Sequence, residues 1–80
     1  MSVKNWSEVV ETAVRRHVVQ TGNLVFTRQA LIDAEMDWIV AETGSLGATP
    51  EMTLSRELQQ LRDRGIIEFV DDRGSYRLLN

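Results

Sequence analysis

Five polar residues in the segment 50–64 have side chains that can hydrogen-bond to the bases or the phosphates of a nucleic acid. They are Thr53, Ser55, Arg56, Gln59 and Gln60. Arginine can donate two hydrogen bonds to guanine, glutamine can pair with adenine, and hydroxyl groups suit phosphate oxygens. The spacing of Leu54, Leu58 and Leu61 predicts a helix that turns these leucines towards a core, with the polar residues on its outer side and flanks. The pattern favours a helix that enters the major groove of duplex DNA, although every amphipathic surface helix has a solvated polar face.

Two further arginines follow this helix and could contact a phosphate backbone. Arg73 lies at the expected tip of a hairpin, and Arg77 lies on the last expected strand. The alternative is that both serve solubility and protect a strand edge. Asp71 and Asp72 at the same tip would repel phosphate, which argues against a tip that enters the minor groove.

The N-terminal half of the chain predicts two helices joined by a short strand. A first helix is expected within residues 5–22, because apolar residues recur there at helical spacing, with a cap at Asn5 or Ser7 and a terminating glycine at Gly22. The apolar run 24–26 predicts the short strand.

A second helix is expected to begin after Thr27, whose hydroxyl can cap it, and to end at Gly44. Phe26 and Leu31 have the spacing of a hydrophobic staple across that start. A break within residues 35–37 would instead give two shorter helices.

The C-terminal half predicts a third helix and a β-hairpin. Thr49 is expected to cap the helix, which runs from Pro50 to about Arg64. The runs "IIEFV" and "SYRLL" are rich in β-branched and aromatic residues and are split by "DDRG", which predicts two strands and a tight turn. The order helix, strand, helix, helix, strand, strand is that of a winged helix-turn-helix domain. We therefore expect residues 1–80 to form a single mainly α domain with three helices, a short strand and a C-terminal hairpin wing.

The segment "LQQLRDRGIIEFVDDRGSYRLL" resembles the winged-helix domain at the C-terminus of methyladenine-directed, Dam-replacing type restriction endonucleases. The residues that carry the resemblance are Leu61, Arg62, Asp63, Gly65, Ile66, Ile67, Phe69, Gly74, Tyr76, Arg77 and Leu78. "LVFTRQALI" is similar to the strand and helix entry earlier in such domains. The resemblance implies a winged helix that binds duplex DNA. We do not expect the nuclease domain that precedes this module in the family, and the segment before the third helix has few basic residues, so we do not carry methyl-base recognition over to this chain.

Composition limits the other classes of function. The chain has 80 residues, a net charge of −3, 42% hydrophobic residues and no cysteine, which is typical of a small globular domain without disulfides. An acidic total argues mildly against tight, nonspecific binding to nucleic acids. No run is long and apolar enough for a membrane span, and the N-terminus is too polar for a signal peptide, so we expect a cytoplasmic protein with no membrane partner.

Catalysis and cofactor binding are not expected. Lys4 is the only lysine and lacks the preceding carboxylates of a restriction-type nuclease centre. His17 is the only histidine and falls on the apolar side of the first helix, so we expect a residue at the boundary of the core rather than a metal ligand. No glycine-rich phosphate loop or nucleophile turn is present.

The main alternative to DNA binding is a winged-helix module for protein–protein interaction or dimerisation. The acidic total, Asp71 and Asp72 favour it, as do the two tryptophans. Trp6 fits either the core or a dimer contact, whereas Trp38 fits the core. A homodimer would present two third helices to a palindromic DNA site, and a larger protein could use the chain as its DNA-binding part. The polar outer side of the third helix favours duplex DNA as the partner, with a role such as transcriptional regulation.

Overall fold

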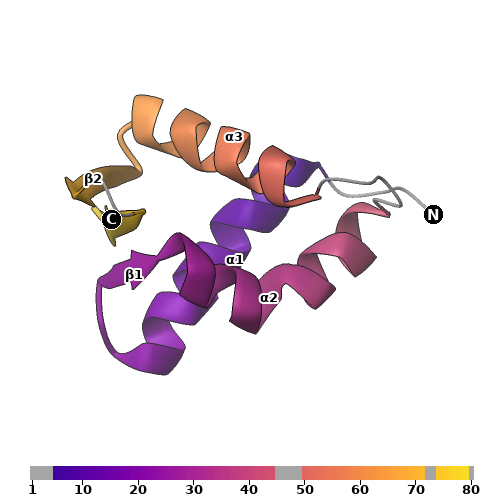
Figure 1. The fold of residues 1–80 in the computed structure, drawn as a ribbon, viewed down its shortest axis with the longest axis horizontal. Coiled ribbons are helices and arrows are strands. Elements are labelled where there is room, and N and C mark those ends of the chain that lie inside the picture. The colour runs from indigo at the N-terminus through magenta and orange to yellow at the C-terminus, as the bar shows by residue number, and fades with distance from the viewer. Residues whose placement is uncertain (1–4, 45–49, 72–73, 80) are drawn as a thin grey trace.

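The computed structural model describes residues 5–44, 50–71 and 74–79 and is mainly helical, with a small antiparallel sheet. In chain order the elements are α1 (Trp6–Thr21), β1 (Val25–Thr27), α2 (Arg28–Thr43), α3 (Pro50–Asp63), β2 (Ile67–Asp71) and β3 (Ser75–Leu78). The three helices pack together along the molecule, and the sheet closes one end of its long axis (Figure 1). The predicted order of helices and strands is confirmed.

The helices begin and end where local chemistry predicts. The Asn5 side chain accepts a hydrogen bond from the Ser7 N–H at 2.7 Å, and Thr27 Oγ1 accepts one from the Ala30 N–H at 3.0 Å. Gly22 follows α1 with φ 70°, in the left-handed region that glycine enters without a steric penalty. α2 continues without interruption through residues 35–37, so the alternative of two shorter helices is wrong. The predicted cap Thr49 lies outside the described residues.

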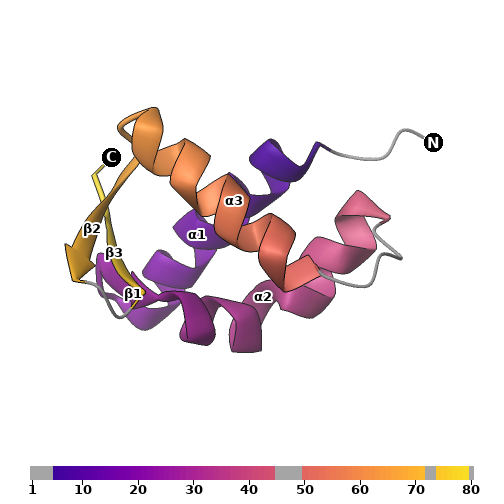
Figure 2. The same cartoon turned by 45° about the horizontal axis from the view of Figure 1, so that its top comes forward.

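The sheet has the strand order β1-β3-β2, with both neighbouring pairs antiparallel. Arg77 on the central strand is opposite Val25 on one side and Glu68 on the other. A register shift between Phe69 and Asp71 marks a bulge in β2, which blunts that edge of the sheet. The hairpin packs beside the C-terminal end of α3, as Figure 2 shows.

The hydrophobic core lies between the three helices and the inner face of the sheet. Leu54, Leu58 and Leu61 are fully buried, which confirms the predicted apolar side of α3. The other members of the core come from the remaining helices and strands: Val9, Val10, Ala13, Val14, Val18, Phe26, Leu31, Ile39, Ile67, Tyr76 and Leu78. Trp6 and Trp38 are only half-buried and pack against this core from its edge. No helix within the described ranges has the length and apolar character that a membrane crossing requires.

Candidate nucleic-acid interface

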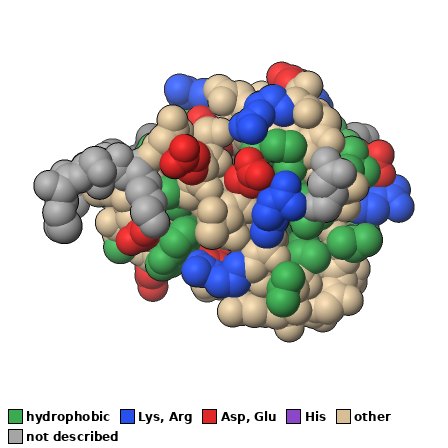
Figure 3. Space-filling model, turned by 180° about the vertical axis from the view of Figure 1, so that it is seen from behind, with side chains coloured by type: hydrophobic (Ala, Val, Ile, Leu, Met, Phe, Trp, Pro, Cys, Tyr) green, Lys and Arg blue, Asp and Glu red, His purple; other side chains and the backbone are tan. Residues whose placement is uncertain are grey.

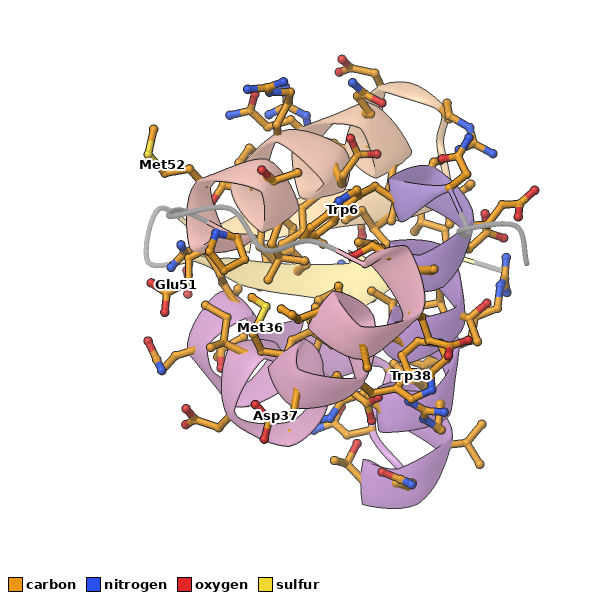
Figure 4. The ribbon with its side chains drawn as sticks, turned by 90° about the vertical axis from the view of Figure 1, so that its right-hand side faces the viewer. Trp6, Met36, Asp37, Trp38, Glu51 and Met52 are labelled. Carbon is orange, nitrogen blue, oxygen red and sulfur yellow. The ribbon has the colours of Figure 1, made fainter. Side chains whose placement is uncertain are left out.

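The outer side of α3 is polar and carries one arginine without a partner. Arg56, Gln59 and Gln60 are exposed. Within residues 5–44, 50–71 and 74–79, Arg56 is the one arginine for which the structure gives no hydrogen bond, ion pair or ring contact. Met52 is the apolar exception and is 67% exposed, and it projects away from the molecule at the start of α3 (Figure 4). The side chains predicted to contact bases are therefore accessible together on one side of one helix.

Ser55 was expected to contact phosphate, but its hydroxyl is already engaged inside the protein. Ser55 Oγ donates to the Glu51 carbonyl oxygen at 3.2 Å, the bond that serine commonly makes to the preceding helical turn. The same oxygen accepts a hydrogen bond from Arg28 Nε at 2.7 Å. Ser55 therefore positions Arg28 and has no free proton for a phosphate oxygen. Thr53 is half-buried on the opposite flank of α3.

The structure describes only one of the two hairpin arginines that were predicted to contact phosphate. Arg73 lies outside the described residues. Arg77 is exposed, but its guanidinium pairs with the Glu68 carboxylate at 2.7 Å across the two neighbouring strands. It lies on the opposite face of the sheet from Tyr76, because side chains alternate along a strand. Arg77 therefore faces away from the side of the sheet that packs against the helices.

Arg28 lies beside the candidate interface, and the sequence patterns did not single it out. It is the first residue of α2 and donates to Ser55 and, at 3.2 Å, to the Glu51 carbonyl oxygen in the first turn of α3. Its backbone N–H donates to the Gly74 carbonyl oxygen at 2.8 Å, which ties the hairpin turn to the same point. A cation in the first turn of a helix opposes the helix dipole, and that local conflict was a signal of a special role.

A second positive charge lies on the sheet side of α3. The Arg62 guanidinium lies over the Phe69 ring, 4.7 Å from its centroid, and Phe69 stacks on Tyr76 at 5.1 Å. Burial raises the pKa of the Tyr76 phenol, and the charges of Arg28 and Arg62 oppose that rise. Both cations therefore lie close enough to Tyr76 to act on its phenol, and Arg62 also pairs with the Asp63 carboxylate at 3.5 Å.

The remaining basic side chains are mostly matched with acids. Arg15 pairs with Glu11 at 3.1 Å within α1, and Arg64 approaches Glu11 at 3.7 Å. The view from behind accordingly shows blue and red side chains interspersed over the surface (Figure 3). Uncompensated positive charge is thus confined to α3 and the start of α2, where Arg28 and Arg56 have no carboxylate partner among the described residues.

His17 is buried, with 7% of its surface exposed, at the edge of the core. Its ring meets Phe26 edge-on at 6.3 Å, which agrees with the prediction of a residue at the core boundary. Within the described segments, no three histidine, aspartate or glutamate side chains are grouped closely enough to hold a metal ion.

Comparisons of the chain with models of protein families, with curated proteins and with solved structures found no match. Function is therefore inferred from the geometry of α3 and the elements around it.

Proposed function

We propose that this chain is a non-enzymatic winged-helix protein that binds duplex DNA. In this proposal α3 enters the major groove, and the hairpin 66–79 braces the backbone beside it. The element order and the strand order β1-β3-β2 are compatible with a winged helix. The resemblance of the C-terminal third to the DNA-binding domain of methyladenine-directed restriction endonucleases supports the same assignment.

The observation that carries the proposal is which arginines pair with carboxylates and which do not. Arg15, Arg16, Arg64 and Arg77 pair with carboxylates, whereas Arg56 projects unpaired beside Gln59 on the outer side of α3. A guanidinium that forks onto guanine must be free of carboxylate partners, and Arg56 meets that requirement. Arg28 is well placed to contact the flanking phosphates, because hydrogen bonds to Ser55 and to the Glu51 carbonyl oxygen already hold its guanidinium in one orientation.

The strength of binding should be modest and sensitive to salt. A protein with a net charge of −3 repels DNA at long range, so affinity must come from the few cations at the interface. We assign the chain a role as a transcriptional regulator or as the DNA-binding partner of a restriction-type system, acting inside the cell.

A titration of fluorescent random-sequence duplex DNA at low and moderate salt tests the proposal. Arg56→Ala should weaken binding and lower the slope of log affinity against log salt by about one. Arg15→Ala is the matched control, because it removes the same charge from α1, where Glu11 already neutralises it. Absence of binding at low salt, or equal losses in the two variants, would contradict DNA recognition by α3.

The alternative function is a winged-helix module for protein–protein interaction or dimerisation that does not bind DNA. Exposed apolar side chains on the sheet or directly beside it favour this alternative, among them Val25, Phe69 and Leu79. The same titration separates the two functions, since a protein-docking module would not bind duplex at either salt concentration.

A further inference from the structure

A pocket opens where the end of α1, the strand β1 and the start of α2 lie beside one another (Figure 1). Its volume is about 360 Å³, within the ~300–1,000 Å³ of sites that hold small molecules. The buried residues His17 and Phe26 form its floor, and Val25, Thr27 and Ala30 belong to its rim. None of the described residues that line it comes from α3, so the pocket is separate from the candidate nucleic-acid interface.

The imidazole of His17 is a buried polar group that opens onto this pocket. Only 7% of the residue is exposed, and the structure gives its ring no hydrogen bond or ion pair within residues 5–44, 50–71 and 74–79. No side-chain nitrogen or oxygen in those ranges is both without a partner and sealed from solvent, so the ring nitrogens reach the surface at the pocket that His17 lines. A polar group buried this far without a protein partner takes its hydrogen bonds from water or from a ligand.

The free hydrogen-bonding groups around the pocket are mainly donors. The side-chain oxygen of Asn23, another rim residue, already accepts from the Val25 N–H at 2.9 Å, which leaves the Asn23 amide NH₂. Thr27 Oγ1 already accepts from the Ala30 N–H, which leaves the Thr27 hydroxyl proton. The imidazole adds at least one N–H.

The electrostatics of the pocket favour an anion. Among the described residues, no aspartate or glutamate lines it. The first turn of α2 forms part of the rim, and the N-terminal end of a helix carries partial positive charge. Together with the excess of donors, this setting suits a carboxylate, which only accepts hydrogen bonds.

We propose that this pocket binds a small carboxylate carried on an aromatic ring. The rings of His17 and Phe26 give the pocket an aromatic floor, and Val25 and Ala30 add apolar surface, so an aromatic ligand buries its ring there. The carboxylate accepts hydrogen bonds from the imidazole N–H and from the Asn23 amide. The site goes beyond the proposed function, because DNA binding by α3 uses none of these residues.

The single histidine of the chain gives a direct test by proton NMR, since the imidazole C2–H signal belongs to His17 alone. Added 2-naphthoate should shift this signal until it saturates, with a dissociation constant of roughly 1 mM because the pocket is open and the probe is small. 2-Naphthylmethylamine carries a cation on the same ring system and should bind several-fold more weakly. A His17 signal that stays in place well above that concentration, or equal affinity for the two probes, would overturn the proposal.

Filling the pocket tests where the probe binds. Ala30→Leu extends a side chain from the rim and leaves the core residues in place, so it should abolish the shift that 2-naphthoate causes. Ala34→Leu makes the same change at an exposed position one turn further along α2, outside the pocket, and should leave binding unchanged. Wild-type affinity in Ala30→Leu, or equal losses in both variants, contradicts binding in the pocket.

Asn23→Asp should reverse the preference between the two probes. Aspartate keeps an oxygen that accepts from the Val25 N–H but replaces the NH₂ donor with a negative charge. 2-Naphthoate should then bind roughly three- to tenfold more weakly, and 2-naphthylmethylamine more tightly. Gln20→Glu adds the same charge at an exposed position of α1 outside the pocket and should have a smaller effect on both probes. Equal effects of the two variants would rule out a contact between Asn23 and the carboxylate.

Discussion

The guanidinium of Arg16 on α1 pairs with the carboxylate of Glu35 on α2, and it lies over the Trp38 ring at 4.1 Å from the centroid. Only 4% of the Glu35 side chain is exposed, so this carboxylate depends on Arg16 for its charge partner. The hydrogen bond with Glu35 is also the main reason that the pKa of Arg16 is raised. The pair thus holds α1 against α2, and α3 packs on these two helices.

We expect Arg16→Ala to destabilise the protein more than Glu35→Gln does. The first change leaves a buried carboxylate without a partner, whereas glutamine carries no charge and its carbonyl oxygen can still accept from Arg16. The difference is measured from the midpoints of urea unfolding curves, compared between variants whose free energy of unfolding falls with urea at the same slope. Arg15→Ala is the control, since its partner Glu11 remains in contact with water and its loss should change the midpoint little. Equal effects of Arg15→Ala and Arg16→Ala would show that Glu35 does not depend on its ion pair.

Arg28 should contribute to both stability and DNA affinity. Arg28→Ala removes two hydrogen bonds that join the start of α2 to α3, which we expect to cost about 1–2 kcal/mol in the free energy of unfolding. Arg28→Lys keeps the charge but cannot reproduce a planar fork to two acceptors, so it should lose stability while retaining most of the salt dependence of DNA binding.

Ser55→Ala separates these two effects. It keeps Arg28 charged while removing one acceptor that orders its guanidinium. We expect a small loss of stability and a modest loss of DNA affinity. If Arg28→Ala weakens folding yet leaves DNA titrations unchanged, Arg28 is a structural link alone.

The direction of the Tyr76 pKa shift predicts how the stability of the fold changes at alkaline pH. Burial raises the pKa of this phenol in the folded state, so the unfolded chain loses its proton first as pH rises. Stability is then full below the ordinary tyrosine pKa of about 10 and falls as pH passes above it. Because Tyr76 is the only tyrosine, ultraviolet difference spectroscopy follows its ionisation directly, and the titration should move to lower pH in urea.

Tyr76→Phe is the matching variant, and it should remove that part of the alkaline loss of stability. A phenol that titrates at the same pH in the folded and the urea-unfolded chain would contradict the role of burial.

Local chemistry was enough to predict the elements, but it could not predict which charges pair. The caps Asn5 and Thr27 and the buried side of α3 follow from residue types and helical spacing, and the structure has them where expected. The partners of Ser55 and Arg77 depend on how α2 meets α3 and on strand register. Arg28 and Ser55 are 27 residues apart in sequence and meet only after the helices pack. Sequence patterns therefore located the candidate interface on α3 but could not show which of its polar groups are already used.

The acidic residues of α3 should limit DNA affinity. Asp63 is exposed on the same side of the helix as Arg56 and faces the expected position of the phosphates. Asp63→Asn removes that negative charge, so we expect duplex DNA to bind roughly two- to fivefold more tightly at low salt, with the gain shrinking as salt screens the charge. Asp37→Asn makes the same change on α2, where Asp37 projects away from α3 (Figure 4), and should have little effect. Equal gains in the two variants would mean that net charge, and not the position of α3 against the duplex, controls binding.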